Sequence, residues 1–322
     1  MVWQLSAAQM RAIASGPASS LAYIAPPPDL SDTARKLLSG AGETALYGKW
    51  RQNPEALIQA ITAQEASAGK PELAARQALP LIKTLPTVNN RAFDSTFAFT
   101  ESETTVAEPV ANDIVVGFNS SADFALGGGF SGYAYSLNNG KTFTEVKFGL
   151  PAYGTIIPTG DPSLASDGAG DVYYSTLGED FGASISYVMV YESTDGGQTF
   201  SPTEIYTGGS GVFLDKPLTA IDANPASPHH GNIYTTLTLF SSASTSPIYV
   251  CTLPGATCVQ IVNEAASGAM PAVGPNGELY VAWEQFSTGG GANPIDALYF
   301  SVSTNGGATF STPAPITSVT PI

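Results

Sequence analysis

Ser193-Thr-Asp195-Gly-Gly197-Gln-Thr199-Phe200 is the stretch that decides the fold of this 322-residue chain. Asp195 is placed to accept hydrogen bonds from the backbone N–H groups of its own turn. Gly197 permits a backbone conformation that other residues rarely adopt. Phe200 supplies an aromatic ring that can pack between sheets. The octapeptide therefore predicts a tight hairpin turn between β-strands, in which Asp195 is structural.

The same turn occurs twice more. Ser136–Phe143 begins 57 residues before Ser193, and Ser303–Phe310 begins 110 residues after it. Because 110 is twice 55, one repeat lacks its turn midway, where Cys251 and Cys258 stand in place of the serine and the phenylalanine. A short β-rich run precedes each turn region, and these four runs begin at Ile114, Val172, Ile233 and Leu279.

Units of this length are typical of propeller blades with four strands each. We therefore predict an all-β propeller with about four recognisable blades, at about 100–150, 158–208, 213–264 and 267–322, within residues 92–322. Residues 1–91 have helix-start signals such as Asn53-Pro54 and are expected to form a small helical region. A series of four blades has two open edges. The sequence leaves four explanations open: a fragment, a four-bladed ring, or an edge covered by the helical region or by a second chain.

The repeated pattern resembles the Asp-box, or BNR repeat, of the sialidase-like β-propellers. Three copies in phase carry the resemblance, although Asn138 and Asn305 stand where that family usually has Asp. An asparagine side chain still offers an oxygen acceptor to the turn. The resemblance implies a structural role, away from the active-site face, for Ser136, Asn138, Gly140, Ser193, Asp195, Gly197, Ser303, Asn305 and Gly307.

Composition and charge exclude several classes of protein. The net charge of −15 makes nucleic acid an improbable partner, and no apolar run is long enough to span a membrane. The charge is uneven: residues 1–91 carry +3, whereas residues 92–322 have three lysines and 21 acidic residues, a net charge of −18. True sialidases hold the substrate carboxylate with three arginines, and residues 92–322 contain no arginine. We therefore expect no sialidase activity.

The two cysteines and the chain start bear on localisation. Cys251 and Cys258 are seven residues apart across an expected hairpin, and we predict that they form a disulfide. A disulfide is typical of an oxidising compartment, so we expect an extracellular, periplasmic or cell-surface protein, although no signal peptide is visible at Met1. His229 and His230 have no ligand pattern around them, and we expect no zinc site.

The resemblance places residues just before each innermost strand at the central mouth. The matching positions are Glu101 with Glu103, Asp161, Asp215, and Met270-Pro271. Converging carboxylates have three uses, which stay open: general acid and base catalysis by Glu103, Asp161 and Asp215, coordination of Ca²⁺, or hydrogen bonds to backbone amides. Apart from Ca²⁺, no cofactor is indicated.

Aromatic residues at the strand ends extend the candidate site. Phe118, Tyr174 and Trp283, the last followed by Glu284, are candidates for stacking on neutral sugars. Packing between blades is the alternative role for each ring.

The sequence favours a carbohydrate-recognising propeller that lacks sialidase chemistry and binds a glycan or polysaccharide. The first alternative is a glycoside hydrolase or lyase that acts on a neutral polysaccharide through the mouth carboxylates. The second is a structural or protein–protein scaffold. Whether the protein is an enzyme stays open, and self-association would be one way to cover an open propeller edge.

Overall fold

The computed structural model describes residues 30, 86–90, 92, 101–125, 128–255, 257–286 and 296–319. These residues form sixteen β-strands and one short helix, α6 (Ser121–Ala125). The predicted helical region, residues 1–91, lies almost wholly outside the described residues, so that prediction is untested. No helix in the described part of the chain is both long enough and apolar enough to cross a membrane.

The strands form four antiparallel sheets of four strands each, and each sheet follows chain order. Blade 1 contains β1 (Glu101–Ala107), β2 (Ile114–Ser120), β3 (Ser131–Ser136) and β4 (Thr144–Glu145). Blade 2 contains β5 (Ile157–Ser166), β6 (Val172–Asp180), β7 (Ile185–Ser193) and β8 (Ser201–Thr207). Blade 3 contains β9 (Phe213–Ile221), β10 (Ile233–Phe240), β11 (Ile248–Leu253) and β12 (Thr257–Val262). Blade 4 contains β13 (Ala266–Val273), β14 (Leu279–Gln285), β15 (Asp296–Ser303) and β16 (Ala314–Val319).

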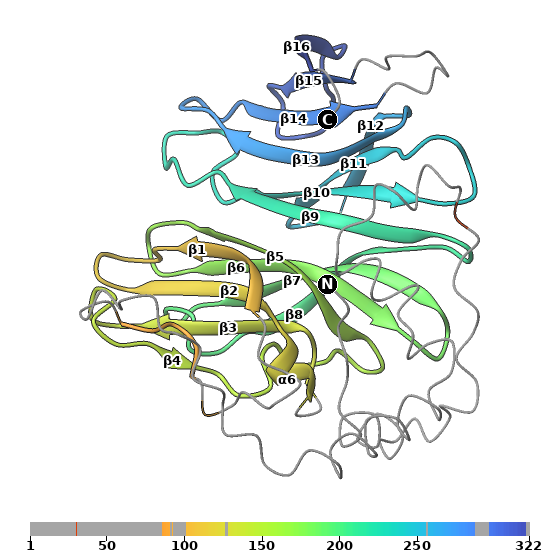
Figure 1. The fold of residues 1–322 in the computed structure, drawn as a ribbon. Helices are drawn as coiled ribbons and strands as arrows, with labels where there is room; N and C mark the ends of the chain where they lie inside the picture. Colours follow the sequence, from red (N-terminus) through yellow and green to blue (C-terminus); the bar gives the residue numbers. More distant parts are fainter. Residues whose placement is uncertain are drawn as a thin grey trace.

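The blades follow one another in space as they do in the sequence (Figure 1). The first strand of each blade packs on the next first strand, so that β1 lies against β5, β5 against β9, and β9 against β13. These four strands are therefore the innermost strands of the series. The all-β, four-bladed propeller predicted from the repeats is confirmed.

Apolar side chains between adjacent sheets form the core. Tyr133, Tyr174 and Phe200 meet between blades 1 and 2, with edge-to-face ring contacts at centroid distances of 5.0 and 5.9 Å. Burial of such rings removes large apolar areas from water and stabilises the contact between the two sheets. Phe200 belongs to the quoted turn, so the turn of blade 2 also supplies part of the core that joins the two blades.

The three repeated turns share one hydrogen-bond network. In blade 2, Asp195 Oδ1 accepts from the backbone N–H groups of Gln198 and Thr199, each at 2.9 Å, and from Ser193 Oγ at 2.8 Å. Ser193 Oγ in turn accepts from Gly197 N at 2.9 Å. Asn138 and Asn305 accept in the same way from Thr142 N and Thr309 N, each at 3.0 Å. An asparagine oxygen therefore replaces the aspartate oxygen without loss of the turn.

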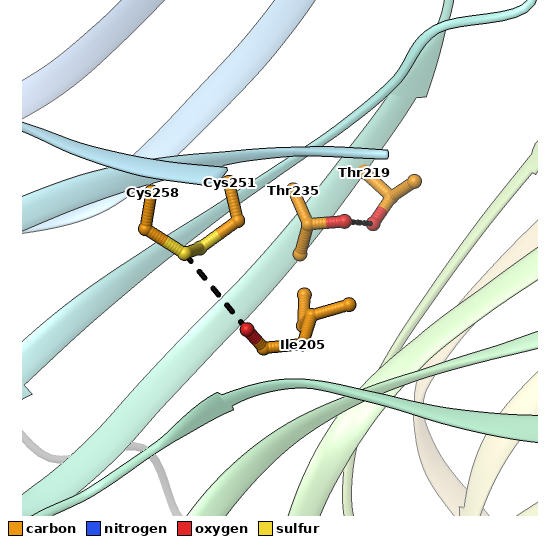
Figure 2. Close-up of a disulfide and its surroundings, with 5 residues drawn as sticks. All are labelled: Ile205, Thr219, Thr235, Cys251 and Cys258. Carbon is orange, nitrogen blue, oxygen red and sulfur yellow. Dashed lines mark hydrogen bonds between the residues drawn. A yellow bond between two sulfur atoms is a disulfide. The ribbon is translucent and has the colours of Figure 1, made fainter. Parts of the chain in front are cut away.

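Blade 3 has a disulfide in place of this turn. Cys251 on β11 and Cys258 on β12 are direct cross-strand partners and are bonded, as predicted. Cys258 Sγ lies 3.9 Å from the carbonyl oxygen of Ile205 on β8 (Figure 2). Cys251 is fully buried among residues of blades 2 and 3. The covalent bond thus stabilises the hairpin and also contributes to the packing of blade 3 on blade 2.

Candidate functional site

Each innermost strand has a β-bulge, and the same position in each bulge has a positive φ. The register shifts lie at Ser102/Thr105, at Gly160/Ser163, opposite Thr236/Thr238, and at Ser267/Met270. The residues with positive φ are Glu103 (52°), Asp161 (55°), Lys216 (55°) and Gly268 (67°). A non-glycine residue in this region is strained by about 1–3 kcal/mol, and such positions often serve function.

The bulges lie at the end of each sheet opposite the repeated turns. In blade 1, Glu101 pairs with Ser120 at one end of β2, whereas Ser136, which starts the turn, pairs with Ile114 at the other end. The side chains at the first three bulges meet across blades 1, 2 and 3. We call Glu103, Asn119, Asp161, Asp215 and Lys216 the axial cluster.

Contacts within the axial cluster join three blades. Asn119 Nδ2 donates to Glu103 Oε2 at 2.9 Å, and Asn119 Oδ1 accepts from Asp161 N at 3.0 Å. Asp161 Oδ2 accepts from Lys216 N at 3.3 Å. Lys216 Nζ lies 3.8 Å from Asp161 Oδ2 and 4.0 Å from Glu103 Oε1. The bulges of blades 2 and 3 are thus each fixed by a side chain from the preceding blade.

Hydroxyl groups hold the backbone beside the bulges. Ser131 Oγ accepts from Gly160 N at 3.0 Å, and Ser175 Oγ donates to the carbonyl of Pro217 at 2.8 Å. Thr236 Oγ1 donates to the carbonyl of Ala269. These hydrogen bonds join each blade to the next, and they satisfy backbone groups that the irregular register leaves unpaired.

Burial and like charge raise the carboxyl pKa values in the cluster. Burial, a hydrogen bond with Asp161 and the charge of Asp161 raise the pKa of Glu103 to about 7, against the smaller lowering effects of Lys216 and Asn119. Burial and the charge of Asp215 raise the pKa of Asp161 to about 6. Burial lowers the pKa of Lys216, but the three carboxylates around it outweigh that effect, and its pKa is raised.

The members of the cluster differ in solvent exposure, and therefore in whether they can contact a ligand. The side chains of Glu103 and Lys216 are 35% and 31% exposed, whereas Asp161 is 5% exposed and Asp215 is fully buried. Asp161 Oδ1 is buried and has no N–H or hydroxyl donor in the described part of the chain. A protonated Glu103 is the neighbour that can donate to Asp161, so the pair can share one proton.

The cluster brings together the three carboxylates that the sequence singled out, Glu103, Asp161 and Asp215. The sequence did not identify Lys216 or Asn119 as site residues. Glu103, Asp161 and Lys216 occupy equivalent positions in successive repeats, and that equivalence could have pointed to Lys216. The expectation that these residues precede the innermost strands is wrong, because they lie inside the strands at bulges. In blade 4 the bulge residue is Gly268, two residues before the expected Met270.

The three candidate aromatic residues are buried. Phe118, Tyr174 and Trp283 are 2%, 0% and 2% exposed. Tyr174 belongs to the core between blades 1 and 2, and Trp283 to the core of blades 3 and 4, where it stacks on Tyr299. The expectation that they offer stacking faces to a sugar is therefore wrong, since their ring faces are buried by apolar packing between sheets. Glu284 is half-buried on β14, opposite Ser267, and is not a member of the axial cluster.

A metal-binding geometry is not found among the residues that the structure describes. No group of three or more His, Cys, Asp or Glu side chains there could hold a metal ion. In the axial cluster, the Lys216 ammonium group lies between Glu103 and Asp161, where it supplies the positive charge. The Ca²⁺ expectation therefore has no support in this cluster.

No protein-family model and no curated protein matches the chain. Solved structures do match it. The α-L-arabinofuranosidase Arb93A of Fusarium graminearum has a TM-score of 0.52 and 14% identity over 74% of this chain and 71% of that chain. The α-L-arabinanase of Penicillium chrysogenum has a TM-score of 0.47 and 14% identity over 67% of this chain and 66% of that one. A sialidase of Trypanosoma rangeli has a TM-score of 0.45 and 10% identity over 71% of this chain and 39% of that one.

The four sheets, their order and the match to the arabinofuranosidase structure together define the fold of the chain as a β-propeller. At this identity the likeness concerns the fold, and function has to be argued from the site.

Proposed function

We propose that this protein recognises neutral carbohydrate at the axial cluster, outside the cell or at its surface. The observation that carries the proposal is that partly exposed Glu103 and Lys216, from different blades, meet at one end of the innermost strands. A carboxyl group and an ammonium group fixed in this way can accept from and donate to the hydroxyl groups of a sugar. The disulfide supports an oxidising location.

The charge of the cluster favours a neutral ligand. Three carboxyl groups surround one lysine, and residues 92–322 have a net charge of −18 and no arginine. An anionic sugar would be repelled by this field and would find no bidentate guanidinium partner. Sialidase activity is therefore not part of the proposal. The repeated turns are consistent with an Asp-box architecture, and their structural role leaves the opposite end of the sheets for the ligand.

Hydrolysis of a neutral polysaccharide is a second candidate, favoured by the pKa of Glu103. A carboxyl group with a pKa of about 7 that reaches solvent is suited to protonate a leaving oxygen. Asp161 is unsuited to be the second catalytic carboxylate, because it is only 5% exposed and lies beside Glu103 at the same lysine, so the two groups cannot flank a glycosidic bond. Asp161 would instead support the proton on Glu103.

A glycan array and a digestion screen of neutral polysaccharides, including arabinans, test both candidates. Wild-type protein is compared with Glu103→Gln and Lys216→Met, and Asn276→Ala serves as a control in an exposed turn. Recognition predicts that the first two variants lose binding while the control keeps it. Hydrolysis predicts product release by the wild type that Glu103→Gln abolishes. Binding that survives both cluster variants would place the ligand elsewhere and contradict the axial cluster as its site. The absence of both binding and turnover would favour a scaffold.

A further inference from the structure

One face of every blade carries an equivalent pair of residues at the same register. On the second strand of each blade, a valine or tyrosine lies opposite an alanine of the innermost strand. The pairs are Val115 with Ala107, Tyr173 with Ala165, Tyr234 with Ala220, and Tyr280 with Ala272. We call the face that carries these residues the forward face, because the next blade packs on it.

The repeated turn of the next blade covers the forward face. A β-carbon on Gly197, in the turn of blade 2, would overlap Val115 of blade 1. A β-carbon on Gly307, in the turn of blade 4, would lie 3.4 Å from Tyr234 Cε1 of blade 3. Val115 and Tyr234 are both fully buried. A glycine at this turn position therefore lets each blade approach the preceding one closely.

Two blades lack this cover. Tyr173 of blade 2 is half-buried, and the blade that follows it has the disulfide hairpin in place of the turn. Tyr280 of blade 4 is 43% exposed, and Met270 on the same face is 61% exposed. The forward face of blade 4 is thus an apolar surface built like two faces that are buried elsewhere in the same molecule.

The opposite face of blade 1, which would pack against a preceding blade, also exposes apolar residues. Val106 on β1 is 65% exposed, and its cross-strand partner Val116 is half-buried. At the positions equivalent to Val116, Tyr174 and Val281 are fully buried against the preceding blades. Gly140, in the turn of blade 1, meets its own blade at Ile114 Cδ1, whereas Gly197 and Gly307 meet residues of the preceding blade.

We propose that the forward face of blade 4 binds blade 1 of a second copy of this chain, with Gly140 placed over Tyr280 as Gly307 is placed over Tyr234. The contact is head-to-tail, and two copies close into a ring when each supplies one such end to the other. Two four-bladed chains make a ring of eight blades, which lies within the range known for propellers, about four to eight. This inference is independent of the proposed function.

Sedimentation equilibrium of the full chain over a range of concentrations tests the proposal. We expect a dimer, and we expect Tyr280→Asp and Val106→Asp each to weaken it by about tenfold or more, because each would bury an unpaired charge. Tyr153→Asp is the matched control, since Tyr153 is 47% exposed and lies in the connection between blades 1 and 2, and it should leave the dimer intact. Far-UV circular dichroism verifies that each variant is folded.

Mixing the two variants tests the head-to-tail arrangement. In a closed pair, Val106→Asp contributes an intact Tyr280 face and Tyr280→Asp contributes an intact Val106 face, so an equimolar mixture should recover a heterodimer with one intact interface. A monomeric wild type at every concentration overturns the proposal. An effect of Tyr280→Asp without any effect of Val106→Asp also overturns it, because that result describes two blade 4 faces meeting each other.

Discussion

Asn119 fixes Glu103 by a 2.9 Å hydrogen bond from Nδ2 to Oε2, and its Oδ1 accepts from the backbone of Asp161 in the next blade. One amide side chain therefore orients the exposed carboxyl group of the axial cluster and also stabilises a strained bulge. Neither contact follows from local sequence, because Asn119 lies 16 residues from Glu103 and 42 from Asp161.

Replacement of Asn119 by alanine should raise the pKa of Glu103 and destabilise the fold. The pKa rises because the hydrogen bond from Asn119 favours the ionised carboxylate. The free energy of unfolding should fall by about 1–3 kcal/mol, since Asp161 N is left buried without its acceptor. Carboxyl carbon NMR titration and urea denaturation measure the two effects. Asn276→Ala, in an exposed turn, should change neither, and an unchanged Glu103 pKa in Asn119→Ala would contradict the assigned contact.

The contribution of the axial cluster to the free energy of unfolding should fall as pH rises from about 4 to 7. The folded-state pKa values of Glu103 and Asp161, about 7 and about 6, lie above their ordinary values of 4.5 and 3.8, so the folded state binds protons more tightly than the unfolded chain. This contribution is complete below the unfolded pKa values and is lost as pH passes the folded ones.

Comparison with Glu103→Gln isolates the effect from other titrating groups. Between pH 5 and pH 8 the wild type should lose stability relative to the variant, by on the order of 1 kcal/mol, because solvent reaches Glu103 and weakens the interaction. Urea denaturation at both pH values gives the difference. A wild type that gains stability relative to Glu103→Gln over this interval would show that the two carboxyl groups do not share a proton.

Loss of the disulfide should weaken the junction of blades 2 and 3. The double substitution Cys251→Ser and Cys258→Ser removes the restraint on a short loop, which is worth about 2–3 kcal/mol in chain-entropy terms, and it places hydroxyl groups beside Ile205. Thermal unfolding under non-reducing conditions measures the loss, and a thiol assay of the native wild type should find no free cysteine. Two free thiols in that assay would contradict the bond.

The sequence predicts the parts of this fold that repeat locally. The turn from Ser193 to Phe200 carries its own hydrogen-bond network within eight residues, so its copies reveal the number and spacing of the blades. The pairing of Cys251 with Cys258 is likewise local, because the two residues face each other across one hairpin.

The axial cluster is only partly predictable because long-range contacts create it. The charge of Glu103 and Asp161 marks them as candidates, but the bulges that turn their side chains together depend on hydrogen bonds from neighbouring blades. For the aromatic residues the sequence-based prediction was wrong, because it placed buried rings in the site. Tyr174 and Trp283 have rings of the kind that stack on sugars, and only the three-dimensional packing reveals that both rings are buried in the core.

Asp195→Ala should destabilise the protein and leave carbohydrate binding unchanged. Asp195 Oδ1 accepts from Gln198 N and Thr199 N, and Asp195 Oδ2 accepts from Thr199 Oγ1 at 2.6 Å. Loss of these bonds should cost about 1–2 kcal/mol, as loss of a capping side chain does. Asp195→Asn should cost less, because Asn138 and Asn305 hold the equivalent turns with the same backbone bonds.

The stability difference between the wild type and Asp195→Asn should also depend on pH. Hydrogen bonds from Thr199 and Ser193 outweigh burial and lower the pKa of Asp195, so its contribution to stability is present at neutral pH and is lost as pH falls through the folded-state pKa. The stability difference between the wild type and Asp195→Asn should therefore shrink below about pH 4, which urea denaturation at pH 3 and pH 7 measures. A folded Asp195→Ala protein that loses carbohydrate binding would place the ligand at the turn end of the sheets and contradict the assignment of the axial cluster.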